Sequence, residues 1–180
     1  MQRQNKKMAM LIEQDFEDVE VSEPMKAFKN AGLEIAIVGN EAGKDYAGKQ
    51  KKIHVRSDIT PEQVNVQDFD ALFIPGGYAP DKMRLHPSMI ELVKKFYESS
   101  KIIAALCHGP QMLISAGLVK NRRMTSWPSV AVDLRNAGAN WVDEPVVSDG
   151  PFITSRKPED IPQFTQAIIE ALGRVPAEAK

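Results

Sequence analysis

Short apolar runs alternate with helix-like segments along almost the whole of this 180-residue chain. An alternation of this kind predicts an α/β protein with a doubly wound, mainly parallel sheet and helices on both of its faces. We predict strands at residues 8–12, 34–38, 53–55, 71–74, 101–106, 124–127 and 141–142, and a hairpin of 146–148 with 152–154 around Asp149-Gly150. We predict helices at residues 22–31, 88–99 (opened by a Ser88/Glu91 capping box), 110–116 and 129–137, a short one opened by Thr60-Pro61, and a last one opened by Pro158.

No repeat or linker divides the chain, so we expect one domain over residues 1–180, with a core of about 7–172 and a frayed tail from Arg174 onward. Hydrophobic residues make up 43% of the chain and charged residues 26%, which is typical of a globular protein. The formal net charge of −1 gives no overall field that would draw the protein to nucleic acid or to an anionic membrane. The apolar stretch at 8–12 is too short for a signal peptide or a membrane span, so the expected location is the cytoplasm.

Residues that hold metals are sparse in this sequence. Cys107 is the single cysteine, so neither an intramolecular disulfide nor a cysteine-based zinc motif can form. The three histidines, at positions 54, 86 and 108, lack the spacing of metal ligands. We therefore expect no metal and no other cofactor. The basic run at residues 49–52 is interpreted as a solvated loop or hairpin flank.

Polar and glycine-containing segments follow several of the predicted strands. Ligands of a doubly wound sheet bind outside the carboxyl ends of its strands, where such segments meet. The segments are Asp15-Phe16-Glu17-Asp18, Pro75-Gly76-Gly77 with Ala79-Pro80-Asp81, Cys107-His108-Gly109-Pro110, Trp127-Pro128 and Ser155-Arg156. We expect them to converge on one edge of the sheet, with Trp127 and Arg156 as candidate substrate-binding residues.

Cys107 lies at the end of an apolar strand and directly before a helix, which is the arrangement of a nucleophile elbow. Gly109 allows close backbone approach, and the following helix N-terminus is expected to favour the thiolate over the thiol. His108 is adjacent and could act as a general base. The alternative is a buried structural thiol, a common fate of free cysteine, but the Cys-His-Gly-Pro context favours function.

Backbone donors and a carboxylate would complete such a site. The N–H groups of Gly76 and Gly77, with that of His108, could form an oxyanion hole, although Pro75-Gly76-Gly77 is equally consistent with a plain turn. Asp81 and Glu17 are the carboxylates available in the neighbouring loops to orient the imidazole. Four other acidic residues surround Glu17, at positions 13, 15, 18 and 20, and the sequence alone does not choose among them.

The chain resembles the ThiJ/PfpI superfamily, and in particular its branch of PfpI-like intracellular proteases, general stress proteins and deglycases. The motifs that carry the resemblance occur in order from about residue 7 to residue 172. They are Asp15-Phe16-Glu17-Asp18-Val19-Glu20, Phe69-Asp70-Ala71-Leu72 before Pro75-Gly76-Gly77, Ala79-Pro80-Asp81, Cys107-His108-Gly109-Pro110-Gln111, Ile114-Ser115-Ala116-Gly117 and Thr154-Ser155-Arg156.

The resemblance implies a flavodoxin-like fold, similar to class I glutamine amidotransferases, and a homo-oligomer that is a dimer or a hexamer built from dimers. It implies that Cys107 is the nucleophile, that Glu17 is the acid hydrogen-bonded to the thiolate, and that His108 is the partner in the dyad. The acid that orients His108 corresponds to Asp81, which in similar proteins reaches the site from a neighbouring subunit.

Two departures from the family pattern bear on the site. Many relatives have Glu in place of Asp81, so the side chain here is shorter by one methylene. Relatives often have Tyr in place of Trp127, so a phenolic donor is missing from the pocket wall.

Three functions are compatible with these residues. The first, which we favour, is a glutathione-independent glyoxalase or deglycase, in which the thiolate attacks methylglyoxal or its adducts with amines. The second is a peptidase or amidase with a Cys-His-Asp triad. Class I glutamine amidotransferases place their histidine far C-terminal to the cysteine, and this chain has no histidine after His108. The third is a redox sensor in which Cys107 is oxidised.

Overall fold

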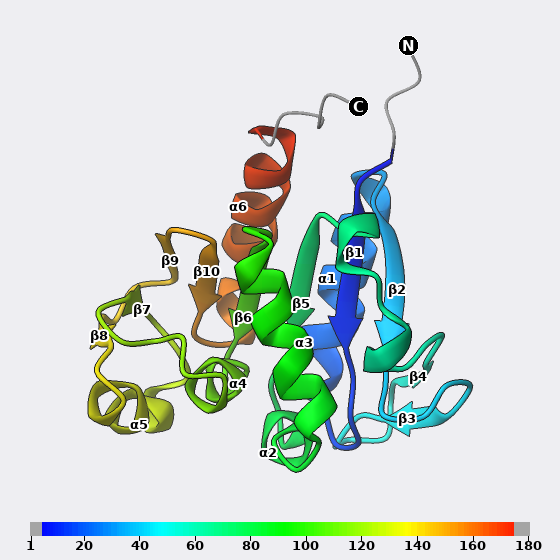
Figure 1. Ribbon diagram of the computed structural model, residues 1–180, viewed down its shortest axis with the longest axis horizontal. Helices are drawn as coiled ribbons and strands as arrows, with labels where there is room; N and C mark the ends of the chain where they lie inside the picture. Colours follow the sequence, from blue (N-terminus) through cyan, green and yellow to red (C-terminus); the bar gives the residue numbers. More distant parts are fainter. Residues whose placement is uncertain (1–4, 175–180) are drawn as a thin grey trace.

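The computed structural model describes residues 5–174. Of the tail that we expected to fray from Arg174 onward, Arg174 is the last residue of a helix and the rest lies outside the described residues. Its centre is a six-stranded sheet in the order β2-β1-β5-β6-β10-β9 (Figure 1). The strands are β1 (Lys7–Leu11), β2 (Glu34–Val38), β5 (Ala71–Ile74), β6 (Ile102–Leu106), β9 (Val146–Asp149) and β10 (Phe152–Ser155). All neighbours are parallel except β9 and β10, which form the predicted hairpin. The predicted α/β class with a mainly parallel sheet is confirmed.

Helices cover both faces of this sheet. Helices α1 (Asp18–Asn30) and α6 (Ile161–Arg174) pack against each other, and they contact β2 and β10 respectively. Helix α3 (Pro87–Glu98) lies on the opposite face against β5 and β6, in front of the sheet in Figure 1. The shorter helices are α2 (Ala79–Met83), α4 (Pro110–Ser115) and α5 (Ala131–Asn136), and four 3-10 turns span Pro61–Gln63, Val66–Asp68, Pro128–Val130 and Pro158–Asp160.

The central strands are apolar along their whole length because both of their faces are covered. Every residue of β5 is fully buried. The Phe73 ring lies 5.6 Å from that of Phe28 on α1 and 5.9 Å from that of Phe164 on α6, so one aromatic cluster joins the strand to both helices. This packing fixes the carboxyl ends of the strands, from which the candidate site is built.

Two small sheets lie outside the main one. Strands β3 (Asp45–Ala47) and β4 (His54–Arg56) form an antiparallel pair, of which the sequence pattern predicted only the second strand. Strands β7 (Arg123–Met124) and β8 (Asn140–Trp141) form a short parallel pair. Among residues 5–174, no helix is long and apolar enough to cross a membrane.

Two local predictions were wrong, and one helix was not predicted. Helix α1 begins at Asp18, four residues before its predicted start, and this changes which acidic residue faces the sheet. Helix α3 begins at Pro87 with His86 as its N-cap, so Ser88 lies inside the first turn instead of capping it. Helix α2 was not predicted, because it has only five residues. Its second and third residues, Pro80 and Asp81, are of types that are also typical of a loop. The Thr60/Gln63 capping box is present, although it opens a single 3-10 turn.

Candidate active site

Cys107 lies on the turn between β6 and α4, at the carboxyl edge of the sheet. Its φ of 62° is in the left-handed region, which a non-glycine residue adopts only when its surroundings impose it. Two backbone hydrogen bonds impose it here: the Cys107 N–H donates to the Ser155 carbonyl at 3.0 Å, and the Cys107 carbonyl accepts the Trp127 N–H at 2.9 Å. A side chain at Gly109 would meet the Ile74 carbonyl at 2.5 Å, so only glycine lets the turn close. The thiol is presented at this edge but is only 6% exposed.

The carboxyl group that faces the thiol belongs to Glu20. Its side chain is fully buried and interacts with the Cys107 thiol. Its Oε2 accepts the Gly76 N–H at 2.8 Å, whereas its buried Oε1 has no hydrogen-bond partner of ordinary geometry among the described residues. Burial raises the pKa of Glu20 to about 7, and the hydrogen bonds from Cys107 and Gly76 only partly oppose that rise. A protonated carboxyl group is therefore available beside the sulfur near neutral pH.

The resemblance implied Glu17 for this role, and the structure corrects that assignment. Glu17 is the N-cap of α1, and its Oε2 lies 2.5 Å from Lys49 Nζ. Because the helix begins at Asp18, Glu17 precedes the first turn and its side chain pairs with the neighbouring loop. Glu20 lies within that turn, on the face buried with Pro24 and Phe28, and this face packs toward the sheet.

The thiol itself is not activated in the resting site, contrary to what the helix N-terminus led us to expect. Burial raises the pKa of Cys107, and the charge and hydrogen bond of Glu20 raise it further. The backbone N–H groups of Gly77 and His108 act in the opposite direction but do not outweigh burial. Cys107 and Glu20 therefore behave as a coupled pair that holds at least one proton near neutral pH.

Two backbone N–H groups point at the sulfur, those of Gly77 and His108. The Gly76 N–H, which we had also considered as an oxyanion donor, is instead bonded to Glu20. The role of Gly76 is steric, because a Cβ there would lie 2.5 Å from Glu20 Oε2 and 2.7 Å from Cys107 Cβ. Gly77 has a φ of 77°, and a Cβ there would clash with the backbone of Phe16 and Glu17, so it too tolerates no side chain.

His108 is the residue that can move a proton to or from the sulfur. Its Nδ1 lies 3.2 Å from Cys107 Sγ, and its ring stacks on that of Trp127 with centroids 6.2 Å apart and planes 23° apart. Burial lowers the pKa of His108, and the positive charge of Lys49 lowers it further, so the imidazole is neutral at neutral pH. Trp127 is partly exposed and forms a wall of the site, as its position after a strand suggested.

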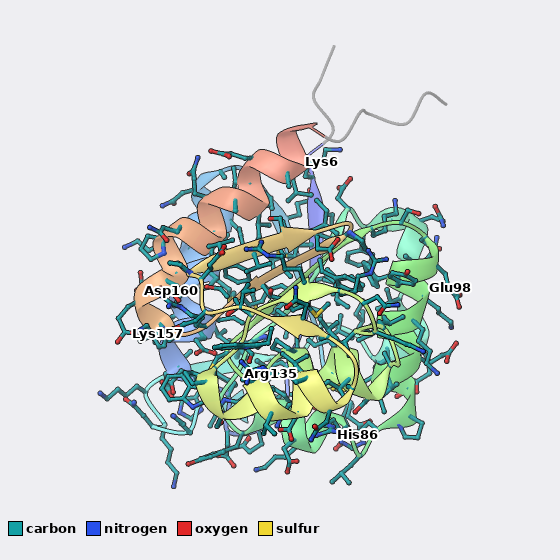
Figure 2. All side chains as sticks on the ribbon, turned by 90° about the vertical axis from the view of Figure 1, so that its left-hand side faces the viewer. Lys6, His86, Glu98, Arg135, Lys157 and Asp160 are labelled. Atoms are coloured by element: carbon teal, nitrogen blue, oxygen red, sulfur yellow. The ribbon has the colours of Figure 1, made fainter. Side chains whose placement is uncertain are left out.

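The other two predicted site residues are not in contact with the thiol. Asp81 is exposed on α2, and within the described part of the chain it makes no hydrogen bond to His108. Arg156 was a candidate substrate-binding residue, but its guanidinium is bidentate to Asp160 and also binds Asp143, each at 2.8–3.0 Å. Figure 2 shows Asp160 beside the start of α6. Arg156 therefore joins β10 to α6, and its donors are directed at carboxylates of the protein.

Lys49 is a second site residue, besides Glu20, that sequence reasoning missed. It was interpreted as part of a solvated basic run, yet its ammonium group pairs with Glu17 and influences the pKa values of both Glu20 and His108. The segment that carries it follows the short strand β3, whose polar sequence gave no signal that it would lie beside Cys107.

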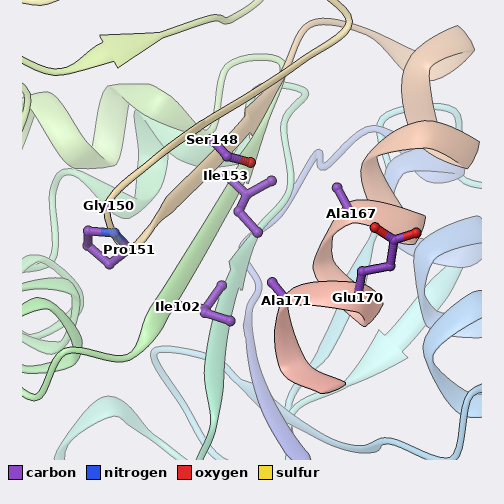
Figure 3. A pocket seen from close by; sticks show the side chains of 8 residues that line it. All are labelled: Ile102, Ser148, Gly150, Pro151, Ile153, Ala167, Glu170 and Ala171. Atoms are coloured by element: carbon purple, nitrogen blue, oxygen red, sulfur yellow. The ribbon is translucent and has the colours of Figure 1, made fainter. Parts of the chain in front are cut away.

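Surface depressions also lie away from this site. One, of about 340 Å³, lies between α6 and the starts of β6 and β10, and is lined by Ile102, Ile153, Ala167, Ala171 and Glu170 among others (Figure 3). Ile102 begins β6, whereas Cys107 follows its end, so this depression is at the opposite edge of the sheet from the thiol.

Comparison with known proteins assigns this arrangement to a family. The sequence profile described as the DJ-1/PfpI family matches residues 6–171. General stress protein 18 of Bacillus subtilis is 44% identical over 94% of this chain and 99% of its own length. Protein/nucleic acid deglycase 2 of Escherichia coli is 38% identical over 94% of this chain and 99% of its own. A two-domain protein of Anabaena variabilis, with DJ-1/ThiJ/PfpI-like and ferritin-like domains, superposes with a TM-score of 0.92 and 41% identity over 98% of this chain and 51% of its own.

Proposed function

This chain belongs to the DJ-1/PfpI family, and we propose that it is a cysteine-dependent enzyme that converts reactive carbonyl compounds to hydroxy acids without glutathione. Methylglyoxal and its adducts with amines are the substrates that we favour. The observation that carries the proposal is the set of groups around Cys107 Sγ: the Glu20 carboxyl, His108 Nδ1 at 3.2 Å, and two backbone N–H groups. A relative of similar length is named a deglycase, which supports the same chemistry.

In the first step, Cys107 Sγ attacks the aldehyde carbon of methylglyoxal. A carbon–sulfur bond forms, and the thiol proton reaches the carbonyl oxygen by way of the neutral His108 imidazole or the Glu20 carboxyl. The N–H groups of Gly77 and His108 stabilise the oxygen while it carries negative charge. The product of this step is a hemithioacetal on Cys107.

In the second step, a base removes the proton from the carbon bonded to sulfur, and a proton is returned to the neighbouring carbon. The first carbon is thereby oxidised to a thioester and the second is reduced to an alcohol, so no external oxidant or reductant is needed. The neutral imidazole of His108 is suited to this transfer. Water then cleaves the thioester, which releases lactate and restores the thiol. In a hemiaminal adduct of methylglyoxal with an amine, the thiol would displace the amine from the same carbon, so that the C–N bond breaks, the thiol proton leaves with the amine, and the same hemithioacetal forms.

The test is release of lactate from methylglyoxal in the absence of glutathione, with wild type compared with Cys107→Ser. We expect turnover in the wild type and only the spontaneous background rate in the variant. Equal rates in the two proteins would contradict the proposal. Peptidase assays on small amides and titration of Cys107 with peroxide would then be the next experiments.

A second candidate is hydrolysis of amides or peptides, and the Cys107–His108 contact favours it specifically. A sulfur within 3.2 Å of an imidazole nitrogen is the dyad from which cysteine peptidases are built. The same residues would serve, with an acyl-enzyme formed on Cys107. Release of a chromophore from small amide substrates, lost in both Cys107→Ser and His108→Ala, is the measurement that would support it.

We also propose that the protein is a homo-oligomer in which Asp81 completes the site of a neighbouring subunit. Support comes from the edge of the sheet that carries Cys107, where Tyr78, Leu85 and Val132 are exposed large hydrophobic side chains. Asp81 lies between the first two of these on α2. If Asp81 acts in trans, a mixture of inactive Cys107→Ser and Asp81→Ala chains, refolded together, regains activity. A mixture that stays inactive while it forms mixed oligomers would contradict this arrangement.

A further inference from the structure

The segment that carries Lys49 is built firmly onto the start of α1. The Lys49 N–H donates to the Phe16 carbonyl at 2.8 Å. The buried Asp18 carboxylate accepts three backbone N–H groups of the same segment, those of Gln50, Lys52 and Ile53, at 2.9–3.0 Å. Burial alone would raise the pKa of Asp18, but these hydrogen bonds outweigh it and the pKa is lowered. The carboxylate stays charged, and the backbone of the segment is fixed where it meets the site.

The Lys49 ammonium group is held at the rim of that site. Its Nζ lies 2.5 Å from Glu17 Oε2 and 5.5 Å from the centre of the Tyr78 ring. The Glu17 N–H in turn donates to the Gly76 carbonyl at 3.3 Å, and Gly76 lies against Cys107. Glu17 and Gly76 thus connect Lys49 to Cys107, and the Lys49 ammonium group also interacts electrostatically with the Cys107 thiol. The Lys49 side chain is 32% exposed, and that of Glu17 is 13% exposed.

Lys49 acts there as a fixed positive charge and not as an amine nucleophile. The hydrogen bond that it donates to Glu17 raises the pKa of Lys49, so the group is protonated at neutral pH. An ammonium group has three N–H donors, and the Glu17 oxygen at 2.5 Å takes one of them. The remaining donors are on a partly exposed group that interacts electrostatically with the Cys107 thiol.

We propose that Lys49 is the anion-binding residue of the Cys107 site, and that the site prefers small aldehydes bearing a carboxylate next to the carbonyl over neutral aldehydes of the same shape. The carboxylate would contact Lys49 at the rim while the aldehyde carbon lies over Cys107 Sγ. This rests on the proposed function in one respect, namely that Cys107 adds to aldehydes. Addition forms one carbon–sulfur bond and moves the thiol proton to the aldehyde oxygen, and nothing else is consumed.

The probes are glyoxylate and its methyl ester, which differ by the charge of one group. Each is titrated as a protectant of Cys107 against alkylation by iodoacetamide, with the extent of alkylation read by mass spectrometry. In the wild type we expect glyoxylate to protect at a concentration about two- to fivefold lower than the ester, as one partly exposed ion pair would give. We expect Lys49→Met to remove this preference, and added salt to weaken it in the wild type.

Two further variants separate charge recognition from damage to the loop. Lys52→Met removes an exposed positive charge three residues away in the same segment and should keep the preference. Glu17→Gln keeps an acceptor for Lys49 but removes the charge that offsets it, and should increase the preference for glyoxylate. A loss of the preference in Lys49→Met together with a gain in Glu17→Gln would identify charge as the cause, because a disturbed loop would weaken glyoxylate binding in both variants.

The inference is overturned if wild type protects equally with both probes, or if Lys49→Met keeps the wild-type preference. Failure of the proposed function would look different. Protection by glyoxylate is measured without turnover, so it can be present when no lactate is released from methylglyoxal. Conversely, a wild type that releases lactate from methylglyoxal but is protected equally by both probes would overturn this inference and leave the proposed function intact.

Discussion

Replacing Glu20 by Gln changes how the stability of this protein depends on pH. The carboxyl group of Glu20 is fully buried, and its pKa rises from an ordinary 4.5 to about 7 on folding. The folded protein therefore keeps a proton that the unfolded chain loses between these two values. The contribution of this proton to stability is largest below pH 4.5, falls as the pH rises toward 7, and is lost above that. Gln carries no such proton, so the variant does not lose this stability.

The size of the effect follows from the rise of the pKa. A rise from 4.5 to about 7 corresponds to about 3 kcal/mol of free energy between the ionised and protonated states. We expect the free energy of unfolding of Glu20→Gln, relative to wild type, to increase by up to about 3 kcal/mol between pH 4.5 and pH 8. The side chains have nearly the same shape, and the Gln oxygen can still accept the Gly76 N–H.

Urea unfolding at several pH values measures this difference directly. Glu23→Gln is the matched control, because Glu23 is exposed on the same helix, so this substitution removes a carboxyl group that folding does not bury. Repeating the pair in a Cys107→Ser background separates the titration of Glu20 from that of the thiol. If the stabilities of wild type and Glu20→Gln run parallel from pH 4.5 to pH 8, Glu20 does not hold a proton in the folded state and the reasoning is refuted.

Four further substitutions, one of them a control, test other parts of the structure. Gly76→Ala should abolish turnover and lower the free energy of unfolding, because the new Cβ would lie 2.5 Å from a buried oxygen of Glu20. Gly173→Ala is the control: its Cβ meets nothing within 4 Å, and it should stabilise α6 by up to about 1 kcal/mol in urea unfolding. Arg156→Ala should lower the free energy of unfolding by about 2 kcal/mol, because it leaves the buried Asp160 carboxylate unpaired. The kcat/KM of the folded variant should be unchanged. A large loss of kcat/KM would instead support a role of Arg156 in substrate binding. Thr125→Val should be neutral or stabilising by about 1 kcal/mol in thermal unfolding, because the Thr125 hydroxyl oxygen is buried without a hydrogen-bond partner among the described residues. A clear destabilisation would mean that the hydroxyl group does have a hydrogen-bond partner.

The sheet could be predicted from the sequence because its central strands are buried on both faces. The strands Glu34–Val38 and Ala71–Ile74 were predicted with their observed bounds, since a short, continuous apolar run between turn residues is typical of a buried strand. Strand Asp45–Ala47 was missed because it pairs outside the main sheet, where no apolar run is required. The nucleophile elbow was placed correctly at Cys107, because the junction of strand and helix is visible in the sequence itself.

The acid beside the thiol could not be chosen in the same way. Five acidic residues occur between positions 13 and 20, and the start of the helix decides which of them faces the sheet. One signal was present: the buried Phe28 and Pro24 are four residues apart, and a further step of four reaches Glu20. Lys49 had no such signal, because the contacts that bring it to the site join segments more than 30 residues apart.

The central claim is that Cys107 Sγ adds to the carbonyl substrate during turnover. The measurement that tests it most directly is mass spectrometry of the Cys107 peptide after acid quenching of the reaction with methylglyoxal, with Cys107→Ser treated identically. The proposed mechanism predicts that this peptide gains the mass of one methylglyoxal, and that the gain disappears as lactate is released. Lactate release at the wild-type rate with an unmodified Cys107 peptide would contradict it.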